Sequence, residues 1–161
     1  MRFKQYIDDS DILREFQINN YFNKFNEVFN FKTDINVIDK HKDHFSCNFE
    51  IDNVRYNYQS KIIEDTTAII VFFPVKMLDM FDEVKSGRYS GKIFSMVLEC
   101  TKYLINEYKD LNKIGFTLEN NKLESLYDRM NKYILKKFNR WKFEGKFINS
   151  NGYIQYTYIK R

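Results

Sequence analysis

The stretch Thr66-Thr67-Ala68-Ile69-Ile70-Val71-Phe72-Phe73-Pro74 decides the fold class of this chain of 161 residues. Its continuous run of β-branched and aromatic residues is typical of a strand that is buried on both faces of a sheet. Proline cannot donate a hydrogen bond to a sheet ladder, so the strand is expected to end at Pro74. The next strand is expected at 113–118, after a helix. A strand–helix–strand unit of this kind requires a parallel, right-handed crossover.

Shorter strands are expected on both sides of this unit. Asp52-Asn53 separates two alternating runs with the chemistry of a tight hairpin turn, and Asn-Ser-Asn-Gly at 149–152 separates the strands expected at 141–147 and 153–160. The apolar residues that alternate in the first two runs are Phe45, Cys47, Phe49 and Ile51, then Val54, Tyr56 and Tyr58. Hairpins on either side of a parallel pair make the predicted sheet mixed.

Three stretches carry apolar residues at helical spacing, at 10–30, 93–108 and 121–139. The last of them opens on Asn121 with Glu124 three residues further on, which is the spacing of a capping box. The predicted order is therefore α-β-β-β-α-β-α-β-β, an α+β fold with a mixed central sheet flanked by helices. Residues 1–9 are expected to form an N-terminal arm, and residues 10–161 a single domain.

The composition is strongly biased. Lys, Asn, Ile, Phe and Tyr make up half of the chain, whereas it contains one Ala and one Pro. Because Ala is so rare, the helices must be held by the packing of large side chains rather than by intrinsic propensity. The 16 Phe and 12 Tyr supply ample apolar area for a core and exclude an intrinsically disordered chain.

The charge is distributed unevenly along the chain. Residues 85–161 carry 16 Lys and Arg against 7 Asp and Glu, whereas residues 1–84 carry 10 against 15. A basic half could contact nucleic acid, a phosphorylated cofactor or an acidic partner. The residues that would contact nucleic acid lie near one face of the last helix: Lys132, Lys136, Lys137 and Arg140. The alternative is that they form a solvated helix face.

Several classes of protein and site are not expected. No stretch of about 18 apolar residues exists, so no membrane span is predicted, and the start of the chain lacks the apolar region of a secretory signal. Cys47 and Cys100 are expected to be free, buried thiols. His41 and His44 lie in a charged stretch that is expected to be a solvated loop, and no metal site is predicted.

Three segments resemble the GNAT N-acetyltransferase superfamily, over roughly residues 10–160. The first is the buried strand 68–73, which leads through the basic loop Gly87-Arg88-Tyr89-Ser90-Gly91-Lys92 into a helix. The second, 114–130, combines a strand, an Asn-capped helix and a Leu-Tyr signature at Leu126-Tyr127, and the third is the final hairpin. The sequence also resembles a group of small phage-encoded GNAT-like proteins, and its AT-rich, Ala-poor composition is compatible with a phage source.

The resemblance implies where a cofactor would bind and which residues would act. In that superfamily acetyl-CoA lies in a V-shaped opening between two parallel strands, here 66–73 and 113–118, with its pyrophosphate at a helix N-terminus. The cofactor-binding residues would be Gly87, Arg88, Gly91 and Lys92. Tyr127 would be the general acid that protonates the leaving thiolate. Its place on the apolar stripe of its helix suits a core residue as well.

Three functions are weighed on these grounds. The first is a catalytically degenerate GNAT-like domain without a cofactor, acting as a virion or protein-interaction component in the host cytoplasm or the virion. It is motivated by Ile93, which stands where the superfamily has a small residue, and by the lack of a marked general base among Glu50, Glu64 and Asp65. The second is an acetyl-CoA-dependent N-acetyltransferase acting on an amine. The third is a nucleic-acid-binding module that uses the basic C-terminal half.

Overall fold

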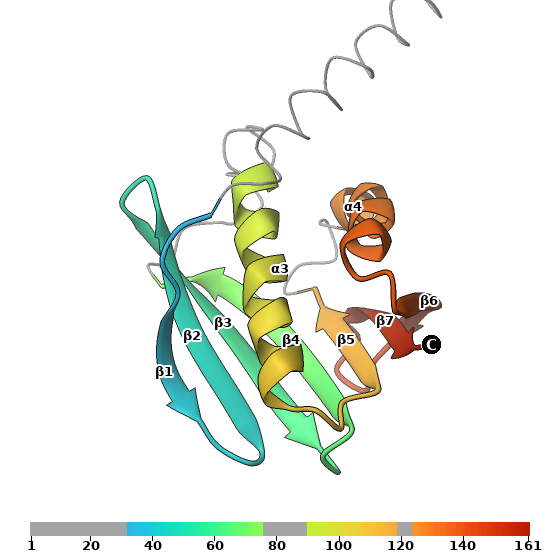
Figure 1. The fold of residues 1–161 in the computed structure, drawn as a ribbon. Helices are drawn as coiled ribbons and strands as arrows, with labels where there is room; N and C mark the ends of the chain where they lie inside the picture. The colour runs from blue at the N-terminus through green and yellow to red at the C-terminus, as the bar shows by residue number, and fades with distance from the viewer. Residues whose placement is uncertain (1–31, 76–89, 119–123) are drawn as a thin grey trace, which may run out of the picture.

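The computed structural model describes residues 32–75, 90–118 and 124–161. Within them, seven strands form one sheet in the order β1-β2-β3-β4-β5-β7-β6 (Figure 1). The strands are β1 (Asn36–Lys40), β2 (His44–Ile51), β3 (Val54–Ile63), β4 (Thr67–Pro74), β5 (Lys113–Thr117), β6 (Trp141–Ile148) and β7 (Ile154–Lys160), and the described helices are α3 (Ser90–Glu107) and α4 (Glu124–Lys137). The predicted arm at 1–9, the predicted helix at 10–30, and Gly87 and Arg88 lie outside the described residues.

The predicted α+β fold with a mixed sheet is confirmed. The β4 and β5 strands pair in parallel, and α3 lies in the connection between them. All the other neighbouring strands pair antiparallel. Both predicted turns are present, and Asp52 and Asn53 have φ angles of 49° and 67°, the left-handed values that a two-residue type I′ hairpin turn needs.

Two features of the sheet were not predicted from the sequence. The β1 strand is an edge strand whose five residues are all exposed, so it has no alternating apolar pattern to reveal it. The second feature is a tight turn between β3 and β4, at Glu64 and Asp65, with φ angles of 51° and 61°. Both edge strands of the described sheet carry a register irregularity, between Val37 and Asp39 in β1 and between Phe143 and Gly145 in β6.

Both described helices pack on the same face of the sheet (Figure 1). Tyr58 of β3 makes a 3.0 Å hydrogen bond with the Thr101 hydroxyl of α3, and the Tyr158 hydroxyl of β7 donates to Asn131 Oδ1 of α4 at 2.8 Å. Large aromatic rings dominate this core, as the composition suggested, and its largest fully buried side chains include five tyrosines: Tyr56, Tyr58, Tyr127, Tyr156 and Tyr158.

The opposite face of the sheet is less covered than the sequence suggested. In β4, Ala68, Ile70 and Phe72 point toward the helices and are buried, whereas Ile69, Val71 and Phe73 are only half-buried. The expectation that this strand is buried on both faces is therefore wrong, because α3 and α4 cover one face and no other described helix covers the second.

The two cysteines are free and buried, as predicted. A hydrogen bond with Cys47 and, after it, burial raise the pKa of the Cys100 thiol, which keeps that thiol protonated. None of the helices in the described parts of the chain is long and apolar enough to cross a membrane.

Candidate functional site

The parallel strands β4 and β5 part before β4 ends. Their ladder runs from Thr67↔Lys113 to Ile70↔Phe116, whereas β4 continues to Pro74 along β3, and β5 continues to Thr117 along β7. The edge of β4 that faces β5 therefore pairs with no described strand over residues 71–74. Backbone N–H and C=O groups on such an edge are available to a ligand with amide groups of its own.

A cavity of about 560 Å³ reaches this parting from the face of the sheet that lies away from the helices. Val71 and Thr117 line it where the strands separate. The Thr117 hydroxyl oxygen is buried and has no hydrogen-bond partner within the described structure. Further polar and charged residues line the remaining wall: Asp39, His44, Ser46, Gln59, Lys61, Asn149 and Asn151. A buried, unpaired hydroxyl in a cavity whose apolar wall carries several polar side chains favours a ligand with hydrogen-bonding groups.

The turn between β6 and β7 forms one wall of the cavity and is fixed by its own hydrogen bonds. Asn149 Oδ1 accepts from the backbone N–H groups of Asn151 and Tyr153, each at 3.0 Å. Gly152 has φ 81°, the left-handed conformation that favours glycine. The Asn-Ser-Asn-Gly signal of the sequence thus marks a rigid element beside the opening.

The N-terminus of α3 lies at the same end of the sheet as the parting. Lys92, in the first turn of α3, places its Nζ 3.7 Å from Asp52 Oδ2 in the β2–β3 turn. That turn is next to the end of β4, because Tyr56 pairs with Pro74. Gly91 is buried, and Ile93 is fully buried in the core, so the bulk of Ile93 is accommodated inside the protein.

Tyr127 lies on the helix side of the opening. Its ring centroid is 6.3 Å from that of Phe72, in the part of β4 beyond the parting, and 5.2 Å from that of Phe94 in α3. The side chain is 2% exposed. This position fits a core residue and also an acid held beside the end of a bound thioester, so the assignment of Tyr127 as the general acid stays a prediction.

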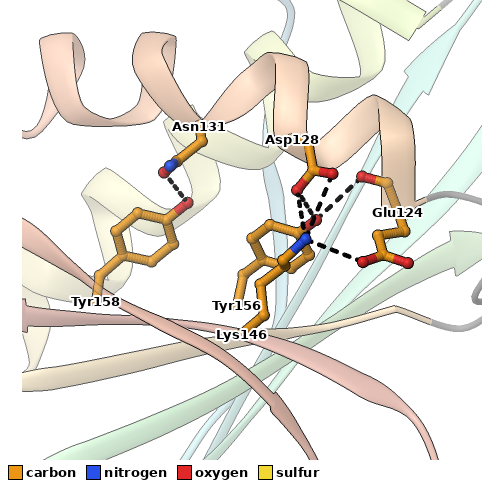
Figure 2. A network of polar contacts seen from close by, with 6 residues as sticks. All are labelled: Glu124, Asp128, Asn131, Lys146, Tyr156 and Tyr158. Carbon is orange, nitrogen blue, oxygen red and sulfur yellow. Dashed lines mark hydrogen bonds and ion pairs between the residues drawn. The ribbon is translucent and has the colours of Figure 1, made fainter.

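A polar network ties α4 to the final hairpin next to Tyr127 (Figure 2). Lys146 Nζ of β6 donates to Glu124 Oε1 at 3.0 Å and to Asp128 Oδ1 at 3.2 Å. The Tyr156 hydroxyl of β7 donates to the Glu124 backbone carbonyl at 3.0 Å and to the Asp128 carboxylate. This network is not predicted from the sequence. The i, i+4 spacing of Glu124 and Asp128 was a signal, but it did not reveal the partner strand.

The network predicts a loss of stability at alkaline pH that Tyr156→Phe reduces. Burial first, and then the hydrogen bond to Asp128, raise the pKa of Tyr156 above its ordinary value of 10.0. Above pH 10 the unfolded chain loses this proton while the folded chain retains it, so the contribution is complete below pH 10 and is lost as the pH rises further. We expect urea denaturation between about pH 9 and 11 to show a shallower loss for Tyr156→Phe than for the unsubstituted chain.

The exposed tyrosine at position 153 provides the control for this measurement. Tyr153→Phe should leave the alkaline profile as it is in the unsubstituted chain. Parallel profiles for Tyr156→Phe and the unsubstituted chain would show that the Tyr156 hydroxyl contributes nothing to the pH dependence.

The structure divides the basic residues predicted for nucleic acid. Lys137 Nζ lies 2.6 Å from Glu99 Oε1 in α3, with both side chains largely buried, so this lysine joins the two helices. Lys136 and Arg140 are exposed, and the side chain of Lys132 is outside the described part of the structure. The nucleic-acid role stays a prediction, with Lys137 assigned to helix packing.

Two of the acidic residues considered as general bases lie away from the opening. Glu64 and Asp65 form the turn before β4, at the end of the sheet where β4 and β5 are still paired. Glu50 lies near the other end, and its carboxylate is 4.0 Å from Arg55 on the neighbouring strand.

Comparison with known proteins found a similarity to a solved structure. No protein-family model and no curated protein matches the chain. A solved structure to which it is similar is that of aminoglycoside acetyltransferase AAC(6')-Ib in complex with coenzyme A and kanamycin. The alignment has a TM-score of 0.42 and 12% sequence identity, and it covers 74% of this chain and 68% of that one.

Proposed function

We propose that this chain binds acetyl-CoA where β4 and β5 part and transfers the acetyl group to an amine held in the adjoining cavity. The observation that carries the proposal is the end of the parallel ladder at Ile70↔Phe116, directly beside a cavity lined by Val71 and Thr117. A ligand bound at the parting would lie beside the open edge of β4 and next to the cavity. A transfer between two substrates needs two such adjoining binding places.

Both charged side chains and backbone amide groups would hold the cofactor. The positive end of the α3 dipole favours a pyrophosphate at the helix N-terminus, with the Lys92 ammonium in the same turn and Gly91 allowing close approach. The amide groups of the pantetheine arm can hydrogen-bond to the open edge of β4, as an added strand does. Gly87 and Arg88 would complete the phosphate site, as the resemblance implies.

The chemistry requires only the two substrates and a proton donor. The amine nitrogen attacks the thioester carbonyl, a C–N bond forms, and the C–S bond breaks. The CoA thiolate leaves with the electron pair of that bond and takes a proton from the Tyr127 hydroxyl. The attacking nitrogen releases a proton to solvent as the amide forms, and solvent returns a proton to Tyr127. Tyr127 is the candidate acid because its ring lies against Phe72, in the part of β4 that flanks the opening.

Acetyl-CoA should raise the melting temperature of the protein. At about one hundred times its Kd, a ligand that binds only the folded state adds about 2.7 kcal/mol, which corresponds to about 5–10 °C for a domain of this size. Thermal denaturation with acetyl-CoA tests the binding, and pantetheine, which lacks the acetyl group and the nucleotide, is the control compound. No shift at millimolar acetyl-CoA would reject the proposal and favour the degenerate, partner-binding domain, which otherwise stays a prediction together with its phage source.

Lys92→Ala should weaken acetyl-CoA binding by about fivefold to tenfold, because it removes a cation from the proposed phosphate site. Lys102→Ala is the matched control, since Lys102 is an exposed lysine on the same helix, away from its N-terminus. Equal affinities for the two variants in a calorimetric titration would place the phosphates elsewhere.

A further inference from the structure

The tip of the β1–β2 hairpin gathers three side chains that commonly bind metals. Asp39 is the penultimate residue of β1, His44 begins β2, and His41 lies in the turn between them. One ligand atom from each lies within 4.8 Å of the other two. His41 Nε2 is 3.5 Å from Asp39 Oδ1, and the two imidazole rings have centroids 4.4 Å apart. From the sequence, His41 and His44 are expected in a solvated loop, whereas the structure places Asp39 and His44 on two paired strands joined by a short turn.

The backbone of this tip is held in place before any ion binds. The His41 N–H donates to the His44 carbonyl at 2.9 Å, which closes the turn. The Tyr108 hydroxyl, just after α3, donates to the His41 carbonyl at 2.6 Å and also lies 3.2 Å from the His44 carbonyl. A backbone fixed on both sides of the turn reduces the ordering that metal binding would otherwise require.

A neighbouring carboxylate orients one of the two imidazoles. His44 Nδ1 lies 3.0 Å from Asp43 Oδ1. An imidazole that donates its Nδ1 proton to a carboxylate presents Nε2 with a free lone pair, which is the usual second-shell arrangement of a metal-bound histidine. The adjacent lysines do not leave the site strongly positive, because Lys40 pairs with Glu107 and Lys42 with Asp65.

We propose that Asp39, His41 and His44 form a binding site for a divalent transition-metal ion of the Zn²⁺ class. Two imidazole nitrogens and one carboxylate oxygen match the ligands that Zn²⁺ takes when three protein groups hold it, with a fourth position left for water or a ligand. Ligand atoms about 2.0–2.1 Å from a tetrahedral ion are about 3.4 Å apart, so side chains now within 4.8 Å must close by about 1 Å. All three side chains are about half exposed, so rotation about their side-chain bonds can bring the ligand atoms this much closer together.

The position of the site links it to the cavity. Asp39 and His44 are both wall residues of the 560 Å³ cavity that reaches the parting of β4 and β5. An ion bound by them would offer its remaining coordination position at the cavity wall, where an anionic or chelating group of a bound molecule could reach it. This site does not depend on acetyl-CoA binding and is tested without it.

Zinc titration of the full, untagged chain after chelator treatment tests the proposal. Calorimetry should show one equivalent of Zn²⁺ bound, and Mg²⁺ at the same concentration should not bind, because hard cations prefer oxygen ligands. His41 and His44 are the only histidines in the chain, so both imidazole signals in an NMR spectrum should shift together on zinc addition. Zinc that binds without moving either signal would overturn the assignment.

Substitutions distinguish zinc binding at this site from zinc binding to the thiols of Cys47 and Cys100 and from nonspecific binding. His41→Ala and His44→Ala should each weaken zinc binding at least about tenfold, and Asp43→Asn, which alters only the outer carboxylate, should weaken it by about tenfold. Lys42→Ala, in the same turn, should bind zinc as the unsubstituted chain does. Unchanged affinity in the two histidine variants, with melting temperatures in chelator equal to that of the unsubstituted chain, would refute the site.

Discussion

Replacing Tyr127 by phenylalanine is expected to lower the rate constant of acetyl transfer by about 10²-fold or more, the usual contribution of a positioned general acid. The substitution keeps the ring, which packs against Phe72, Phe94 and Tyr156, and removes the hydroxyl alone. The free energy of unfolding should fall by only about 1 kcal/mol, the net value of one hydrogen bond. Single-turnover kinetics with acetyl-CoA and an amine library, together with urea denaturation, give both quantities.

Tyr133 provides the matched control on the same helix. It is also buried, and Tyr133→Phe removes a hydroxyl from α4 at a position two turns from the opening. We expect this variant to keep its transfer rate. Equal rates for Tyr127→Phe and the unsubstituted chain would identify Tyr127 as a core residue, and the thiolate would then take its proton from solvent.

Phe72→Ala is expected to lower the free energy of unfolding by about 3–5 kcal/mol, the usual cost of removing a buried phenylalanine. Phe72 is 2% exposed, and its ring contacts Phe94 edge-on and Tyr127 in a stacked arrangement, with centroids 5.6 and 6.3 Å away. The loss should appear as a lower midpoint of urea denaturation, with the slope unchanged.

The adjacent Phe73 tests whether the two faces of β4 differ. Phe73 is half-buried on the face away from α3 and α4, so Phe73→Ala should cost clearly less than Phe72→Ala. Similar losses for both variants would mean that the second face is covered as completely as the first. The same pair also probes the site, because only Phe72 lies beside Tyr127.

Much of the fold could be predicted because strong local patterns coincide with single elements. The apolar run ending at Pro74, the turns at Asp52-Asn53 and at 149–152, and the helix that carries Tyr127 all appear where expected. The β1 strand could not be predicted, since an exposed edge strand is defined by its pairing with β2 and not by its side chains. The half-exposed face of β4 was missed because composition alone does not tell which neighbours cover a strand.

The candidate site could be predicted only in part. The resemblance names Gly91 and Lys92 as cofactor-binding residues, and the structure places both in the first turn of α3, near the β2–β3 turn. Their role in binding a cofactor stays a prediction. The contacts of Lys146 with Glu124 and of Tyr108 with the hairpin tip could not be found, because they join residues far apart in the sequence. Such contacts depend on strand order, which a single sequence does not specify.

The irregularities in the two edge strands limit how another protein can bind. A β-bulge bends and twists an edge strand, and charged residues beside it oppose the straight backbone ladder that an incoming strand needs. The β1 strand is offset between Val37 and Asp39 and ends on Lys40, and β6 is offset at Gly145, where φ is 153°, beside Lys146. Intermolecular sheet extension is therefore disfavoured at both edges of the described sheet.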